Sequence, residues 1–161
     1  QHRASGVGAL GDHSCLQSKL IEFESMEAKM LNTKIFSTIK ERTEEASRWL
    51  HEAKGYTSIR EGYANTTLMA IAPETWDSIL KKDGSVQHLN FPTKTVFKSF
   101  IEISPKEIII QAASRQRYID QSQSLNLMID PSVPAKDINQ LYLFSCIFES
   151  ERGGRVHFKN N

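Results

Sequence analysis

The sequence is poor in cysteine and histidine, the residues most often used in metal and redox chemistry. Its two cysteines, Cys15 and Cys146, lie far apart and form neither a CxxC pair nor a spacing typical of metal ligands. The five histidines are scattered along the chain, and no two are spaced for one helix face. We therefore expect free thiols, as in a reducing cytoplasm, and no metal site.

Long apolar runs and an excess of charge of one sign are also missing. No run approaches the roughly 20 apolar residues that a membrane span requires, and the first six residues lack the apolar core of a signal peptide. The formal net charge is only +1, so no general attraction to nucleic acid or to an anionic membrane is expected. These absences predict a cytoplasmic protein with no nucleic-acid or membrane partner.

The composition that is present suits a soluble globular domain. The chain has 161 residues, of which 39% are hydrophobic and 24% charged, enough for one core. The clearest element is a long amphipathic helix over residues 25–54, which Gly55 ends because glycine adopts a left-handed conformation without a steric clash. Its expected apolar stripe consists of Met26, Met30, Ile35, Phe36, Ile39, Ala46, Trp49, Leu50 and Ala53.

Two short apolar runs predict strands. Residues 67–72 form an uninterrupted apolar run, which is typical of a strand buried on both faces, and residues 125–129, which include Asn126, are interpreted as a second buried strand. Between them we expect a helical turn at residues 76–80 and a turn at residues 82–85.

Two further helices are predicted from their starting residues. Ser104, Pro105 and Glu107 form the pattern of a capping box, and the helix that they open should run to about residue 118. A final helix should begin near Pro134. The order of elements predicts an α/β fold in which helix dominates. Residues 150–161 are polar and contain two glycines, so we expect a divergent, loose tail there.

Residues 6–11 match the dinucleotide-binding pattern GxGxxG. Such a motif lets the backbone approach a pyrophosphate at a helix N-terminus, but it requires a preceding strand, and too few residues precede it here. A flexible lead-in to a helix is the alternative interpretation, and the missing strand favours it.

Three cations also share one predicted helix, namely Lys106, Arg115 and Arg117. They indicate either a phosphate site or a solvated helix face. The second interpretation is favoured because no aromatic platform accompanies them.

Several stretches resemble class I ribonucleotide reductase large subunits. The most specific is R-Q-R-Y-I-D-Q-S-Q-S-L-N-L at residues 115–127. The stretch G-S-V-Q-H-L at residues 84–89 is also similar to the family pattern, and further similar blocks occur in the family order at residues 3–17, 23–25, 65–73 and 134–142.

This resemblance implies a helix-rich partial arc of the family's ten-stranded α/β barrel, in which a cysteine radical reduces ribonucleoside diphosphates to deoxyribonucleotides for DNA synthesis. Residues 1–149 would be the C-terminal part of that barrel, with an internal deletion near residues 73–74. The chain contains no N-x-C-x-E pattern, no Tyr-Tyr pair and no cysteine pair in its tail. We therefore expect no catalytic residue here and no cofactor, since the metal and radical belong to the family's small subunit.

The resemblance also points to a remnant of the loop that holds the substrate phosphates. In the family this Thr/Ser-rich loop follows the strand that corresponds to residues 67–72. Here Pro73 leads almost directly to Thr75, which is either a remnant of the phosphate loop or a turn residue beside the deletion. A single hydroxyl without its nest of N–H groups binds anions weakly, which favours the turn.

Three roles remain open for such a chain. It is a piece of a split reductase, a non-catalytic module that binds reductase subunits, or a decayed gene product. An incomplete barrel exposes strand edges and apolar surface. Self-association or binding to another reductase chain is therefore expected.

Overall fold

The computed structural model describes residues 2–71, 96–98, 102–125, 127, 129 and 132–150. Residues 148–150 are described by their backbone alone. Four helices form in this part of the chain: α1 (Asp12–Ser18), α2 (Met26–Lys54), α3 (Pro105–Gln116) and α4 (Ala135–Ser150). The turns expected at residues 76–80 and 82–85 lie outside the described residues, as do residues 151–161 of the tail predicted at 150–161; its first residue, Ser150, is the last residue of α4.

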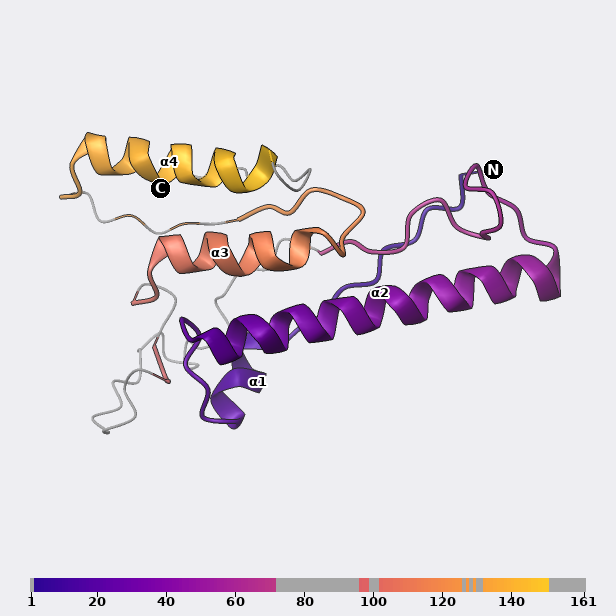
Figure 1. Ribbon diagram of the computed structural model, residues 1–161, viewed down its shortest axis with the longest axis horizontal. Helices are drawn as coiled ribbons and strands as arrows, with labels where there is room; N and C mark the ends of the chain where they lie inside the picture. Colours follow the sequence, from indigo (N-terminus) through magenta and orange to yellow (C-terminus); the bar gives the residue numbers. More distant parts are fainter. Residues whose placement is uncertain are drawn as a thin grey trace, which may run out of the picture.

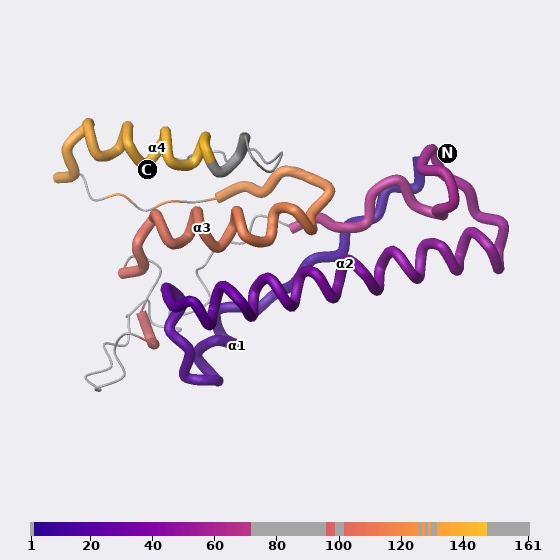
Figure 2. Tube along the Cα trace, viewed as in Figure 1, coloured from indigo at the N-terminus to yellow at the C-terminus, as the bar shows by residue number. Residues whose placement is uncertain are grey.

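The helices are stacked on the N-terminal half of the 29-residue α2. Figure 1 shows α3 lying between α2 and α4, with α1 on the opposite side of α2, and α3 contacts both α2 and α4. The C-terminal half of α2 extends beyond this stack. The tube in Figure 2 shows that the start of the chain and the loop after α2 come together at that end.

Both ends of α2 agree with the sequence prediction. The Ser25 hydroxyl accepts a hydrogen bond of 3.1 Å from the Ala28 amide, as an N-cap residue does. At the other end Gly55 has a φ of 65°, and its N–H donates to the His51 carbonyl at 3.0 Å. The local rules of helix capping therefore place this helix correctly.

The start of α3 is predicted correctly, but its capping box does not form. Ser104 is the N-cap residue, yet its side chain makes no capping hydrogen bond. The Glu107 carboxylate instead pairs with Lys29 of α2 at 2.8 Å. The Ser104 amide that Glu107 would have bonded donates to the Glu24 carboxylate at 2.9 Å. A long-range contact has taken the place of the local one.

The two predicted strands are much weaker than expected. Residues 67–70 pair in parallel with residues 5–7 through three hydrogen bonds of 2.8–3.2 Å, but within the described residues the only isolated bridge is that between Val7 and Met69. In the described part of residues 125–129 no ladder forms. The partner of residues 67–70 is thus the glycine-rich segment, for which the sequence favours a flexible lead-in. The segment does lead into α1, as predicted, but at Val7 it is also held by backbone hydrogen bonds that the sequence did not predict.

The core consists of two clusters. The larger one joins α1, the start of α2, α3 and the turns around them, and it contains Leu16, Ile21, Phe23, Ala28, Ile103, Ile108, Ile109, Ala112, Leu125 and Leu127. The smaller one lies beside the middle of α2 and contains Phe36, Leu68, Met69 and Ile119. The apolar faces predicted for the two runs are therefore buried, even though neither run forms an extended strand.

The buried stripe of α2 is displaced from the predicted one. Met26, Met30 and Trp49 are exposed, at 69%, 68% and 57% of their surface. The residues of this helix that are buried are Ala28, Asn32, Phe36 and Ser47. Two of these are polar and make hydrogen bonds inside the molecule, so a pattern based on hydrophobicity alone misses them.

Candidate functional site

The predicted remnant of the phosphate loop, Pro73 and Thr75, lies outside the described residues. The described chain reaches Ile71, two residues before Pro73. The candidate site is therefore the framework that leads up to this point. We call it the Asp120 junction and define it by Val7, Lys40, Leu68, Met69 and Asp120.

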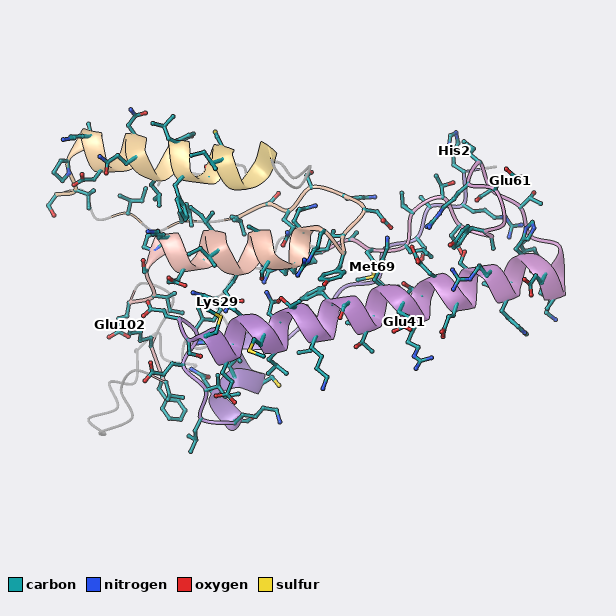
Figure 3. All side chains as sticks on the ribbon, viewed as in Figure 1. His2, Lys29, Glu41, Glu61, Met69 and Glu102 are labelled. Carbon is teal, nitrogen blue, oxygen red and sulfur yellow. The ribbon has the colours of Figure 1, made fainter. Side chains whose placement is uncertain are left out.

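The polar contacts of Asp120 join three parts of the chain. Its Oδ2 accepts hydrogen bonds from the amides of Leu68 at 2.7 Å and Met69 at 3.0 Å. Its own amide donates to the Met69 carbonyl at 3.1 Å. Its Oδ1 pairs with the Lys40 ammonium on α2. The same ammonium lies 3.7 Å from the Glu44 carboxylate. In Figure 3 Met69 is seen beside α2, where these segments meet.

The electrostatics of the junction favour a charged carboxylate. Burial acts to raise the pKa of Asp120, but the hydrogen bonds from Lys40, Leu68 and Met69 outweigh it and hold the pKa below its ordinary value. The side chain is 22% exposed, so solvent screens part of this interaction. Asp120 is therefore a firmly ionised acceptor rather than a proton donor.

The charged chain continues toward the end of α2. Glu44 accepts from Arg60 at 3.0 Å, and the Arg60 guanidinium lies 3.7 Å from the centre of the Tyr63 ring. The ring hydroxyl of Tyr63 accepts from Arg48 at 2.9 Å. These contacts tie the loop after α2 to the helix and continue the junction along its length.

A buried amide network supports the other side of Asp120. The Gln123 amide donates to the Ala112 carbonyl at 2.9 Å and to the Gln116 side chain at 2.8 Å. Its oxygen accepts from Arg115 at 2.7 Å. The Gln116 amide in turn donates to the Gln121 carbonyl at 3.0 Å. This network fixes the chain that follows Asp120 against α3.

The predicted solvated face of α3 is only partly correct. Arg117 is exposed, but Arg115 is half-buried and contributes to the amide network. Burial lowers the pKa of Arg115, and the nearby Asp12 partly opposes this. The same burial raises the pKa of Asp12, against the effect of Arg115. Arg115 thus acts as a structural donor.

The glycine-rich segment serves packing. A Cβ atom on Gly8 would lie 2.7 Å from the Ala70 carbonyl oxygen, and one on Gly6 would lie 3.0 Å from the Ala70 Cβ. The glycine spacing is explained by this close backbone pairing, because the Ala70 carbonyl takes up the space where a Cβ atom on Gly8 would lie.

The two cysteines take no part in the junction's contacts. Cys15 on α1 is half-buried, Cys146 on α4 is exposed, and both are free. Among the described residues no cluster of three or more His, Cys, Asp or Glu side chains could hold a metal ion. None of the helices in the described part of the chain is both long and apolar enough to cross a membrane.

The chemistry available at the Asp120 junction is positional. Two backbone amides and one ammonium group surround a carboxylate, and this arrangement holds a chain segment in place. Reasoning from the sequence missed Asp120 and Lys40, which are 80 residues apart. The available signal was the position of Asp120 within the most specific of the family-like motifs, at residues 115–127.

Comparisons with known proteins agree with this framework. The family model for the ribonucleotide reductase barrel domain matches residues 1–79 and 64–146. The ribonucleoside-diphosphate reductase large subunit of Invertebrate iridescent virus 3 is 31% identical over 200 residues, covering 88% of this chain and 32% of the viral protein. The alpha subunit of the same enzyme from Treponema pallidum (strain Nichols) is 26% identical and covers 89% of this chain and 23% of its own.

A solved structure extends the likeness to three dimensions. The alpha subunit of the class Id ribonucleotide reductase from Actinobacillus ureae matches 99% of this chain with a TM-score of 0.80 and 38% identity, and the match covers 40% of that subunit. The chain thus spans well under half the length of these relatives. It belongs to the ribonucleotide reductase large-subunit family and corresponds to part of the barrel domain.

Proposed function

We propose that this chain has no reductase activity on its own and acts only as a part of a ribonucleoside-diphosphate reductase assembly. The observation that carries the proposal is a mismatch between fold and chemistry. The barrel-domain model matches most of the chain, yet the sequence contains no N-x-C-x-E pattern and no Tyr-Tyr pair. Radical reduction of a ribose needs a thiol in the barrel and a relay to it, and this chain supplies neither. A cytoplasmic location and a cofactor carried by another subunit belong to the same proposal.

We also infer that the chain forms a partial arc of the ten-stranded barrel, shortened by an internal deletion near residues 73–74. Two observations support the deletion. The two family matches overlap at residues 64–79. The alignment with the iridescent virus protein is 200 residues long, longer than the whole 161-residue chain, although it covers only 88% of that chain. Gaps in this chain account for both observations.

Within this proposal, Pro73 and Thr75 are the remnant of the substrate-phosphate loop. Support comes from the segment before them, where residues 67–70 pair in parallel with residues 5–7, as neighbouring strands of such a barrel do. Asp120 and Lys40 hold this segment from its other side.

The partner proposed is another reductase chain or a second copy of this one. The backbone of residues 5–7 is paired on one side by residues 67–70, and Val7 is 38% exposed. Four large apolar side chains in or next to α1 and the first two turns of α2 are more than 60% exposed, namely Leu10, Leu20, Met26 and Met30. An edge and an apolar surface of this kind favour association.

The activity test uses the purified chain with a competent small subunit, a dithiol and a nucleoside diphosphate. We expect no deoxynucleotide above the small-subunit blank. The matched positive control is an intact large subunit from a relative under the same conditions. Turnover by this chain and the small subunit alone would overturn the proposal.

A second experiment separates the split enzyme from the alternative, a non-catalytic module that binds reductase subunits. The upstream part of a relative's large subunit, with its radical cysteine, is mixed with this chain. Restored turnover identifies a split enzyme. If the mixture is inactive and the chain instead inhibits an intact reductase, it is an interaction module. Light scattering over a range of concentrations tests self-association, which a monomer at all concentrations would contradict.

A further inference from the structure

Two successive backbone amides in this chain point at one carboxylate oxygen. The amides of Leu68 and Met69 donate to Asp120 Oδ2 at 2.7 and 3.0 Å. Consecutive N–H groups that converge on one oxygen are well placed to hold an anion. These amides and Asp120 are separated by more than 50 residues of sequence, so the contact is tertiary.

The pairing with the glycine-rich segment leaves these two amides available. That pairing uses the carbonyls of Thr67 and Leu68 and the amide of Ala70. The Leu68 and Met69 amides are directed elsewhere, to Asp120. Because Leu68 and Met69 are only 4% and 0% exposed, both amides would lack an acceptor without the carboxylate, at a cost that buried N–H groups rarely bear.

An ammonium group completes the surroundings of the anion. Lys40 reaches from α2 to the second oxygen, Oδ1. The Asp120 amide donates to the Met69 carbonyl at 3.1 Å, and this bond fixes the backbone from which the carboxylate extends. Each oxygen thus has its own donors, from two different parts of the chain.

We propose that Leu68, Met69 and Lys40 form a carboxylate-binding site, and that Asp120 is the positioning residue that fills it as an internal ligand. By filling this site, Asp120 holds residues 68 and 69 in place beside α2. That this placement matters for Pro73 and Thr75, which follow in the sequence, rests on the proposed function, but the site itself does not.

The two amides and the Lys40 ammonium are all donors, so the group that fills the site must present acceptors on both of its oxygens. An asparagine in place of Asp120 is the same size, but its NH₂ group is a donor. It would face either the two amides or the Lys40 ammonium, and one set of donors would lose its acceptor. A small free carboxylate such as formate has the acceptors that the site requires and should replace the side chain when that is removed.

The test is hydrogen exchange measured by NMR at the Leu68 and Met69 amides, with Asp120→Gly as the variant. We expect exchange at these two amides to speed up about tenfold or more, since hydrogen bonds to a charged group are lost. Sodium formate should restore most of the protection, and sodium chloride at the same ionic strength should not. Loss of protection that formate fails to restore in a folded variant would overturn the site.

Two lysine variants serve as matched tests in the Asp120→Gly background. Lys40→Met should abolish the rescue by formate. Lys34→Met, at an exposed position of the same helix, should leave the rescue unchanged. Equal rescue in both variants would show that Lys40 is no part of the site.

If Asp120→Gly does not fold, Asp120→Asn gives an independent measurement. The amide protons of Leu68 and Met69 should move upfield relative to the unaltered chain, because their hydrogen bonds to a charged oxygen weaken. Unchanged shifts at both amides would contradict the proposal. Neither measurement needs a nucleotide or a partner subunit, so a chain that proved to be an active reductase would leave this result untouched.

Discussion

Gly8 and Ala70 lie so close together that a Cβ atom on Gly8 would be 2.7 Å from the Ala70 carbonyl oxygen. This contact joins two segments that are more than 60 residues apart in the sequence. It explains the glycine spacing as a condition for backbone pairing. It also provides the first test of the fold.

Substitution of Gly8 by alanine should destabilise the chain by about 2 kcal/mol, since the added methyl group forces apart two backbones that have no room to yield. The free energy of unfolding is measured by urea titration, followed by circular dichroism. Gly62→Ala is the matched control. Gly62 has a φ of 75°, but a methyl group added to it would have no atom within 4 Å, so only conformational strain of about 1 kcal/mol is expected there. A Gly8 variant no less stable than the control would rule out the close pairing.

Two helix N-caps give a paired comparison. The Ser25 hydroxyl accepts from the Ala28 amide at 3.1 Å, whereas the Ser104 side chain makes no capping bond. Ser25→Ala should therefore cost about 1 kcal/mol of stability, and Ser104→Ala should change it by less than about 0.5 kcal/mol. Urea titration of the two variants in parallel checks this. A larger loss at Ser104 would mean that the capping box forms in solution.

These two serines also show how far the sequence could predict the fold. Ser25, Gly55 and Pro105 act through the residues next to them, so helix ends follow from local rules. Ser104 and Glu107 satisfy the same local pattern, but Glu24 and Lys29 offer stronger long-range partners. A rule based on neighbouring residues cannot predict that these long-range partners replace the capping box.

The candidate site was less predictable for the same reason. Lys40 reads as one charge among many on an amphipathic helix, and its contact with Asp120 depends on how residues 67–70 are placed between them. The exposed Met26 and Met30 show the converse error, since the apolar pattern assigns them to the core whereas polar Asn32 is buried. Resemblance to a family identified the motif around Asp120 but not the contacts of that residue.

Asn32 should be one of the residues most sensitive to substitution in α2. It is 1% exposed, and its amide donates to the Gln111 carbonyl at 2.9 Å and to the Ser114 hydroxyl at 2.7 Å, both on α3. Asn32→Ala removes these two hydrogen bonds to α3 and should lower the free energy of unfolding by about 2 kcal/mol. Ser37→Ala is the control, since within the described residues that hydroxyl bonds only the carbonyl of Lys34, in its own helix, at 3.0 Å; a change within about 0.5 kcal/mol is expected. Equal losses in the two variants would contradict a role of Asn32 in joining the helices.

Glu24 should make the stability of the chain depend on pH. Burial acts to raise its pKa, but hydrogen bonds from Lys98 at 2.6 Å and from the Ser104 amide at 2.9 Å outweigh burial and lower the pKa below the ordinary 4.5. A carboxyl group whose pKa is lowered by folding contributes stability that is complete above its ordinary pKa and is lost as the pH falls through the lower, folded value. The stability difference between the unaltered chain and Glu24→Gln should thus be constant near neutral pH and shrink in acid.

Urea titrations of both chains from about pH 7 down into the acid range test this, since all other carboxyl groups are common to the two proteins and cancel in the difference. Glu41→Gln is the control, because Glu41 is exposed and points away from the rest of the molecule in Figure 3. Its difference from the unaltered chain should stay small at every pH. A difference for Glu24→Gln that grew in acid would have the wrong sign for a carboxylate held by Lys98 and the start of α3, and it would show that folding raises the pKa of this group instead of lowering it.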